Sequence, residues 1–360
     1  MNRASDIDIS KIKRILIIMM GGIGDMILLT PALKALRKAY PSSTLSFLLG
    51  PYGAEKVIEG SDLINKKIII DPEKYKGVKG KIKLIQELRK EKFSLSITST
   101  GTNPIKSGLL CYLAEVKYRL GENIDGKGFF YNLKVPFNPE RHNVESNIDL
   151  LQRLGIKADD KRTYIYRSSE DKYFANNIFA DHHLEGKRLI GIHPGSGIHQ
   201  ARFRRWPKER FARLADELIE KYKASVMIFG GADEVSLACE IKDLMNSNPI
   251  LMAGKTTLTQ AAALIEECRL CISNDSGLMH VACAVNTPTL GIYGPTNYKR
   301  TGPYSDSSII IRRGLDCSPC YKREKVKCKR LDCFKLIAVE DVFEAVNSLM
   351  EKNLNYEQRL

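Results

Sequence analysis

The chain of 360 residues is long enough for two domains of ordinary size, and its composition, 43% hydrophobic and 27% charged, is that of a soluble globular protein. The net charge of +14 indicates an anionic partner, such as a phosphorylated substrate, a membrane surface or nucleic acid, or else a basic soluble protein with no such partner. Aromatic residues are sparse around the basic clusters and no nucleic-acid-binding motif occurs, so nucleic acid is disfavoured.

No run of residues approaches the ~18 apolar positions that a membrane span needs. The run Ile15–Met20 is too short for the core of a signal peptide, and Asp6 and Asp8 interrupt the basic segment before it. We therefore expect a cytoplasmic protein. Five scattered cysteines have apolar surroundings typical of buried thiols in a reducing compartment: Cys111, Cys239, Cys268, Cys271 and Cys283.

In the first half of the chain, apolar strands alternate with helices. The predicted strands are 14–20, 44–49, 68–70 and 94–98, and the predicted helices are 26–39 and 81–90. Continuous apolar strands separated by helices predict a parallel sheet that is covered on both faces.

A polar stretch, 155–169, interrupts this pattern, which then resumes. The predicted strands are 188–193, 225–230, 250–252, 271–273 and 289–293, and the predicted helices are 207–222, 233–245, 259–268 and 278–284. The chain is thus expected to be an α/β protein of two Rossmann-like, doubly wound domains, 1–165 and 166–360, that face a central cleft. Ligands of such sheets bind at the carboxyl ends of the strands.

The first motif, "GGIGD", follows the first predicted strand. Gly21, Gly22 and Gly24 let the backbone turn sharply and approach a ligand, and Asp25 lies at the start of a helix. The spacing does not match the dinucleotide-binding fingerprint, and the second strand ends without an acid for a ribose, which disfavours an NAD-dependent oxidoreductase. The local pattern alone favours a helix cap over a catalytic role for Asp25.

The second motif, "HPGSGIHQARFRRWP", combines a strand end, a glycine-rich loop and three arginines, Arg202, Arg204 and Arg205, before a helix that opens at Trp206-Pro207. Backbone amides and guanidinium groups together suit a phosphate or diphosphate. The alternative is a solvated basic loop, but the convergence of these features favours a binding site.

The third motif, "NDSGLMH", lies where another predicted strand passes into a helix. The amides at Ser276 and Gly277 can hold phosphate oxygens, and Asp275 can accept a hydrogen bond from a sugar hydroxyl. His280 is either a structural residue or a partner for a phosphate or hydroxyl group.

Four cysteines cluster near the end of the chain, at Cys317, Cys320, Cys328 and Cys333. Their spacing is compatible with a structural zinc or iron–sulfur site, and equally with free or redox-active thiols.

The sequence has no phosphate-binding Walker motif and no Gly-x-Ser-x-Gly motif, and its Asp-x-Asp pair, Asp6 and Asp8, lies in the leading segment. Charge on a diphosphate would then be balanced by cationic side chains and helix N-termini instead of a divalent metal ion.

The three motifs together resemble glycosyltransferase family 9, the bacterial ADP-heptose:lipopolysaccharide heptosyltransferases. The resemblance runs in order over nearly the whole chain and is carried by Gly21–Pro31, His193–Gly197 with Arg204–Pro207, and Asn274–His280. The resemblance implies a GT-B architecture, with the acceptor on the N-terminal domain and the nucleotide sugar on the C-terminal one. It implies inverting, metal-independent transfer of a heptose or similar sugar, without a cofactor, to a lipopolysaccharide core or related anionic glycolipid at the inner-membrane surface. A non-catalytic nucleotide-sugar-binding homologue is the alternative.

The resemblance also implies roles for individual residues. Asp25 takes the position of the general base, and Arg204 that of a lysine that binds the diphosphate. Donor contacts are implied for Ser196 at the phosphates, Glu234 at the ribose, Thr256 at the adenine, and Asp275, Ser276, Gly277 and His280 at the donor-binding turn.

Overall fold

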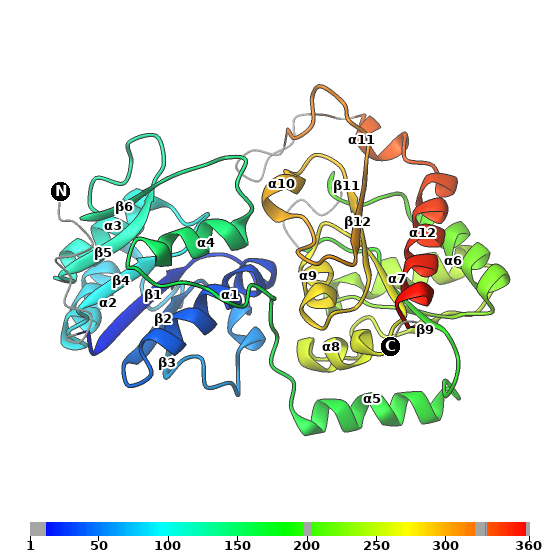
Figure 1. The fold of residues 1–360 in the computed structure, drawn as a ribbon, viewed down its shortest axis with the longest axis horizontal. Helices are drawn as coiled ribbons and strands as arrows, with labels where there is room; N and C mark the ends of the chain where they lie inside the picture. The colour runs from blue at the N-terminus through cyan, green and yellow to red at the C-terminus, as the bar shows by residue number, and fades with distance from the viewer. Residues whose placement is uncertain (1–11, 198–202, 321–327, 329, 358–360) are drawn as a thin grey trace. The chain divides into compact units, whose positions relative to one another are not determined.

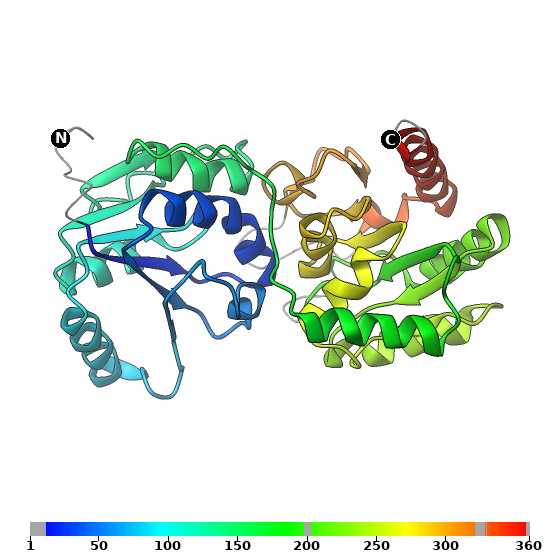
Figure 2. The same ribbon diagram turned by 60° about the horizontal axis from the view of Figure 1, so that its bottom comes forward.

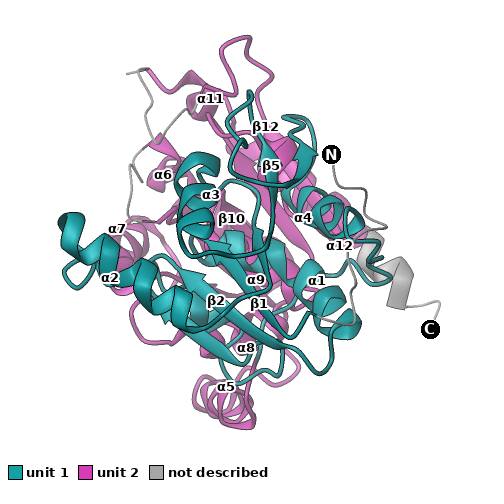
Figure 3. Ribbon diagram, turned by 90° about the vertical axis from the view of Figure 1, so that its left-hand side faces the viewer, with its two compact units in different colours: residues 1–166 teal, residues 167–360 magenta. Residues whose placement is uncertain are grey.

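The computed structural model describes residues 12–197, 203–320, 328 and 330–357. The chain divides into two compact units, 1–166 and 167–360, which Figure 3 shows in different colours. Each unit contains one six-stranded sheet with helices on both faces (Figure 1).

Unit 1 has the strand order β3-β2-β1-β4-β5-β6, and every neighbouring pair is parallel. Its strands are β1 (Arg14–Met19), β2 (Thr44–Leu49), β3 (Lys66–Ile69), β4 (Leu95–Thr98), β5 (Tyr118–Asn123) and β6 (Leu133–Pro136). Its helices are α1 (Ile23–Ala39), η3 (Ala54–Val57), α2 (Gly77–Lys90), α3 (Pro104–Leu113) and α4 (Asn143–Gln152).

The central strand β1 is buried from Ile15 to Met19 because both of its faces are covered. On one face, Leu16 and Ile18 pack with Leu84 and Leu88 of α2, in a core that also takes in Cys111 of α3. Helices α1 and α4 pack against one another on the other face (Figure 1).

Unit 2 has the strand order β12-β11-β10-β7-β8-β9, again with parallel pairs throughout. Its strands are β7 (Leu189–His193), β8 (Ser225–Ile228), β9 (Ile250–Leu251), β10 (Leu270–Asn274), β11 (Thr289–Tyr293) and β12 (Ser308–Arg312). Its helices are α5 (Ser169–Asp181), α6 (Lys208–Tyr222), η5 (Ala232–Glu234), α7 (Val235–Leu244), α8 (Leu258–Glu266), α9 (Gly277–Ala284), α10 (Tyr298–Thr301), α11 (Asp332–Lys335) and α12 (Val339–Glu357).

The core of unit 2 lies between the sheet and helices α6, α7 and α12. Trp206 is buried at the start of α6, where its ring meets Phe211 edge-on and its Nε1 donates to the Ile337 carbonyl oxygen at 3.0 Å. Helix α5 lies beside α8 (Figure 2). Between them, Thr259 Oγ1 donates to Asp171 Oδ1 at 2.9 Å.

Counted within its own unit, each sheet follows the strand order 3-2-1-4-5-6 of doubly wound Rossmann folds. The predicted fold class is therefore confirmed. The strand order reverses between β1 and β4 in unit 1 and between β7 and β10 in unit 2, and ligands of such sheets bind outside the carboxyl ends of the strands at this switch point. In the part of the chain that the structure describes, no helix is long and apolar enough to cross a membrane.

Candidate active site

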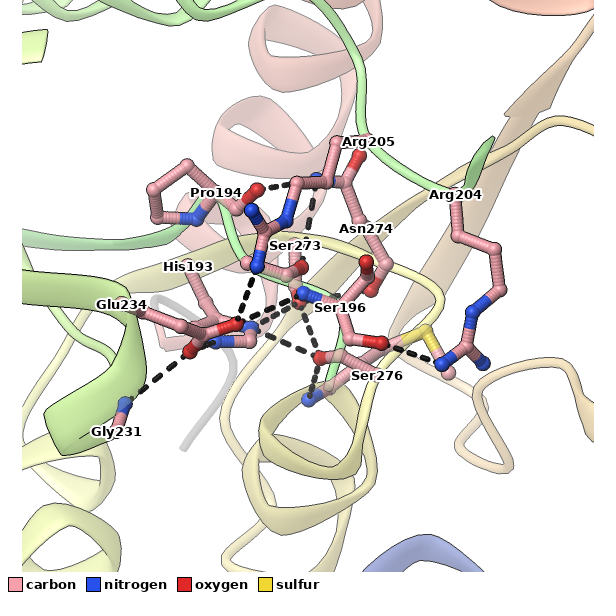
Figure 4. A network of polar contacts seen from close by, with 12 residues as sticks. His193, Pro194, Ser196, Arg204, Arg205, Gly231, Glu234, Ser273, Asn274 and Ser276 are labelled. Carbon is pink, nitrogen blue, oxygen red and sulfur yellow. Dashed lines mark hydrogen bonds and ion pairs between the residues drawn. The ribbon is translucent and has the colours of Figure 1, made fainter. Parts of the chain in front are cut away.

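Three loops meet at the carboxyl edge of the unit 2 sheet, and a buried histidine joins them (Figure 4). His193, the last residue of β7, is 3% exposed. Its Nε2 lies 2.9 Å from Glu234 Oε2 in the segment after β8, and its Nδ1 lies 2.9 Å from Ser276 Oγ after β10. One imidazole therefore connects the ends of three neighbouring strands of this sheet, β10, β7 and β8.

Glu234 fixes the backbone conformation of the glycine-rich loop after β7 through hydrogen bonds. Its Oε1 accepts from the Ser196 amide at 3.0 Å and lies 3.3 Å from Arg205 Nη2, and its Oε2 accepts from the Gly231 amide at 3.1 Å. A Cβ on Gly195 would lie only 1.8 Å from Glu234 Oε1, so only glycine leaves room for the carboxylate at this point.

The carboxylate of Glu234 is stabilised in its ionised form. Burial alone would raise its pKa, but the hydrogen bond and charge of His193, the Gly231 amide and the charge of Arg205 outweigh burial and lower the pKa to about 2. The glycine-rich loop after β7 is thus held by the negative charge of the Glu234 carboxylate, which is surrounded by hydrogen-bond donors of the same chain.

Arg204 belongs to the segment between β7 and α6, and its side chain lies beside the glycine-rich loop after β7 and the segment after β10. One of its guanidinium nitrogens donates to the Ser196 carbonyl oxygen, and another lies 4.0 Å from Asp275 Oδ2. The backbone next to it is anchored, because the Trp206 amide donates to Asn274 Oδ1 at 3.0 Å while Asn274 Nδ2 donates to the Pro194 carbonyl oxygen at 2.7 Å. This arrangement fixes a cation at the carboxyl edge of the sheet.

Helix α9 begins beside this cation. Ser276 caps the helix by accepting from the Met279 amide at 3.3 Å, and Gly277 is the first helical residue. Burial raises the pKa of Asp275, and the nearby charge of Arg204 opposes that shift. A helix N-terminus next to a guanidinium group is chemically suited to bind an anion such as a diphosphate.

Two further donor-binding candidates are Thr256 and His280. Thr256 follows β9, is half-buried and directly precedes Thr257, which caps α8. His280 is buried on α9, one helical turn beyond Gly277. Arg202 belongs to the residues that the structure does not describe.

In unit 1, the glycine motif forms the turn from β1 into α1. Asp25 is half-buried in the first turn of the helix, and its Oδ2 accepts from the Gly22 amide at 3.0 Å. A Cβ on Gly21 would lie 2.2 Å from that oxygen, so the glycine makes space for the carboxylate. The N-cap residue is Gly22, and not Asp25 as the local pattern indicated; Asp25 is the third helical residue and accepts from the N-cap amide, and Gly24 lies in the same first turn.

A polar loop that was not among the predicted site motifs, residues 99–102, follows β4 on the other side of the unit 1 switch point. The Thr100 amide donates to Asn147 Oδ1 at 3.0 Å, and Thr100 Oγ1 donates to the buried Glu122 at 2.9 Å. The hydroxyl-rich sequence "STGT" directly after an apolar strand was the available signal. His193 and Asn274, which connect the unit 2 loops, stand within the quoted motifs but were assigned no role there.

The four-cysteine segment, 317–333, is described by the structure only in part, at residues 317–320, 328 and 330–333. Among the described residues, no group of three or more His, Cys, Asp or Glu side chains is arranged to hold a metal ion. Cys317 is exposed and Cys333 is buried, and burial raises the pKa of Cys333 to about 11. The prediction of a zinc or iron–sulfur site here is therefore unsupported.

Comparison with known proteins identifies the family. The model of glycosyltransferase family 9 (heptosyltransferase) matches residues 81–330, which is more than half of the chain. The chain belongs to glycosyltransferase family 9. It is accordingly a glycosyltransferase with a GT-B fold, as the three motifs predicted.

Similar proteins cover most of this glycosyltransferase. Lipooligosaccharide heptosyltransferase 2 of Haemophilus influenzae is 28% identical over 310 residues, which cover 83% of this chain and 88% of that protein. A family 9 glycosyltransferase structure from Veillonella parvula has a TM-score of 0.77 at 27% identity and covers 94% of this chain and 97% of its own. The structure of ADP-heptose lipopolysaccharide heptosyltransferase II of E. coli has a TM-score of 0.72 at 24% identity, covers 94% and 99%, and supports the fold.

Proposed function

We propose that this glycosyltransferase moves a heptose, or a similar sugar, from ADP-heptose to a lipopolysaccharide core or a related glycolipid, with inversion and without a metal ion. The observation that carries the proposal is the position of Arg204 beside the N-terminus of α9, at the switch point of the unit 2 sheet, an arrangement suited to a diphosphate. The heptosyltransferase names of similar proteins support the sugar and the acceptor class.

In this proposal, the diphosphate of the donor binds to Arg204 and to the amides at Ser276 and Gly277. These groups balance the charge that grows on the leaving diphosphate as the bond to the sugar breaks. Ser196 contributes to the same phosphates, while Thr256 lines the adenine and His280 supports the donor turn. Because chain donors already surround Glu234, a ribose hydroxyl could bind it only by adding to or replacing one of them.

Asp25 is the proposed general base. It takes the proton of the acceptor hydroxyl while that oxygen attacks the anomeric carbon of the sugar, and ADP leaves from the opposite side. One such displacement inverts the configuration at that carbon. The N-terminus of α1 favours the anionic carboxylate that this role requires, and the Gly22 amide fixes its position.

The proposed acceptor is an anionic glycolipid, and the enzyme would work in the cytoplasm as a peripheral protein of the inner membrane. The net charge of +14 supports this, because basic proteins are attracted to the anionic cytoplasmic leaflet.

The test of the proposed function is turnover. Mixing the protein with ADP-heptose and a lipopolysaccharide-core acceptor should release ADP and give a product of inverted anomeric configuration by NMR, at a rate that EDTA leaves unchanged. If ADP-heptose binds but no ADP is released, the non-catalytic alternative is correct.

A thermal-shift panel with ADP, UDP, GDP, CDP and NAD should locate the donor site. ADP at 100 times its Kd should stabilise the wild type by ~2.7 kcal/mol. Loss of a charged hydrogen-bond partner worth about 1.5–3 kcal/mol should remove most of that stabilisation in Arg204→Ala. The control is Arg213→Ala, an exposed arginine on α6 that pairs with Glu217. Stabilisation by UDP or GDP instead would show a different donor nucleotide.

A further inference from the structure

Exposed apolar side chains gather at one edge of unit 1. Tyr52 follows β2, Val78 follows β3, Ile105 follows β4 and Phe129 follows β5, with exposed fractions of 52%, 74%, 37% and 57%. Because all six strands are parallel, their carboxyl ends lie at the same edge of the sheet, which also carries Asp25 after β1. The proposed acceptor base and these apolar side chains therefore share an edge.

Helix α3 extends this apolar region away from the edge. Its inner side buries Gly108 and Cys111, while four apolar residues at helical spacing remain exposed on its outer side: Ile105, Leu109, Tyr112 and Leu113. The outer side of a helix on a soluble protein is normally polar. The exposed apolar stripe on α3 would therefore be stabilised by contact with an apolar environment.

Aromatic contacts continue the stripe onto the loop after β5. The rings of Tyr112 and Phe130 lie 5.8 Å apart, and those of Phe129 and Phe130 lie 4.5 Å apart. The guanidinium group of Arg119 lies 5.4 Å from the centre of the Tyr112 ring. One basic side chain, Arg119, therefore contacts the aromatic part of this surface.

Helix α2 supplies further positive charge next to α3. Both helices pack on the same face of the sheet, Arg89 Nε donates to the Leu113 carbonyl oxygen at 2.7 Å, and Figure 3 shows both helices on the side that faces the viewer. Lys79, Lys81 and Lys90 are exposed on α2 and form no ion pair with any residue that the structure describes. The α2–α3 surface, residues 77–90 and 104–113 with Tyr52 and Phe129, is thus both apolar and basic.

This composition favours a lipid surface over a protein partner. Apolar and aromatic side chains enter the headgroup boundary of a bilayer while lysines bind anionic headgroups, each contributing to affinity. The cores of protein–protein interfaces are instead depleted in lysine.

We propose that the α2–α3 surface docks this glycosyltransferase on an anionic bilayer and so presents the carboxyl edge of unit 1 to the glycolipid acceptor. The proposal rests on the proposed function, which places the acceptor in the membrane. It adds the residues that contact the bilayer and explains why the apolar side chains follow the same strand ends as Asp25.

The test is flotation with vesicles of equal parts phosphatidylglycerol and phosphatidylcholine. The wild type should float with these vesicles and not with phosphatidylcholine alone. A triple variant, Ile105→Ser, Leu109→Ser and Phe129→Ser, and a second one, Lys79→Gln, Lys81→Gln and Lys90→Gln, should each bind at least about tenfold more weakly. The matched control replaces three exposed apolar residues of unit 2, Tyr173→Ser, Leu244→Ser and Leu336→Ser, and should bind like the wild type.

Turnover with a deacylated, water-soluble acceptor separates the two proposals. Both surface variants should keep wild-type turnover on this acceptor, which would also show that they fold. Wild-type vesicle binding by the apolar triple variant would overturn the docking proposal while leaving the function intact. If turnover is absent but vesicle binding depends on the surface, the proposed function fails and the docking surface stands. If sedimentation shows a dimer that the apolar triple variant dissociates, the surface is a protein interface and the docking proposal is wrong.

Discussion

Replacing Asp25 by asparagine should lower the kcat of sugar transfer by roughly 10²–10⁴-fold, the contribution typical of a general base. The asparagine side chain has nearly the same shape and can still accept from the Gly22 amide, so the start of α1 should remain intact. It cannot take the proton of the acceptor hydroxyl. The measurement is kcat at saturating donor and acceptor, together with the thermal shift that ADP causes, which should equal that of the wild type.

A matched control is Asp159→Asn in the same unit, where an exposed carboxylate pairs with Lys38. This variant should keep wild-type kcat, because exposed ion pairs contribute little to stability and this one lies outside the glycine turn. Turnover of Asp25→Asn within a few-fold of the wild type would show that another group, or water, accepts the proton. Asp25 would then act only at the start of the helix.

The sequence predicted elements best where a strand is buried on both faces. After Arg14, the residues of β1 form a continuous apolar run, and those of β2 are mostly apolar, as is typical of strands that are covered on both faces. β5, with the sequence YRLGEN, mixes charged and apolar residues and was missed, although its Glu122 is buried in a hydrogen bond with Thr100. Its strand character comes from pairing with β4 and β6, which local pattern does not reveal.

The start of α1 shows a similar limit. The helix was predicted from Met26 because the glycines before it read as loop, but it begins at Ile23 and includes Asp25 in its first turn. The early start has a local cause that the low helix propensity of glycine hides: Asp25, the third helical residue, accepts from the amide of Gly22, the N-cap residue. The side chain of Asp25 therefore points back into the turn instead of lying before the helix.

The site motifs could be found because each follows a strand, and parallel strands bring their ends together. Their connection could not be found in the same way. His193 and Glu234 are 41 positions apart, and only the placement of β7 between β8 and β10 brings the imidazole to both Glu234 and Ser276.

The spacing of the four cysteines near the end of the chain suggested a metal centre, whereas Cys317 is exposed and Cys333 belongs to the core.

Replacing Glu234 by alanine should destabilise unit 2 by about 3–5 kcal/mol, the cost typical of removing one member of a buried charged pair. The change leaves the Ser196 and Gly231 amides and the His193 ring without their acceptor. Urea unfolding followed by fluorescence reports this directly, because the chain has a single tryptophan, Trp206, buried in the unit 2 core. The exposed Glu240→Ala, which removes a surface pair with Lys208, should cost no more than about 1 kcal/mol.

The same carboxylate should make the stability of unit 2 depend on pH in a defined direction. The pKa of Glu234 is about 2 in the folded chain and 4.5 in its ordinary state, so folding favours the ionised form. Its contribution, about 3 kcal/mol at 1.36 kcal/mol per pKa unit, is complete above pH ~4.5 and is lost as the pH falls toward ~2. Glu234→Gln has no such proton to bind, so the difference in free energy of unfolding between the wild type and this variant should shrink steadily from pH 5 to pH 3. A difference that stays constant over this range would mean that the carboxylate is not held ionised by its neighbours, and the loop after β7 would then need another anchor.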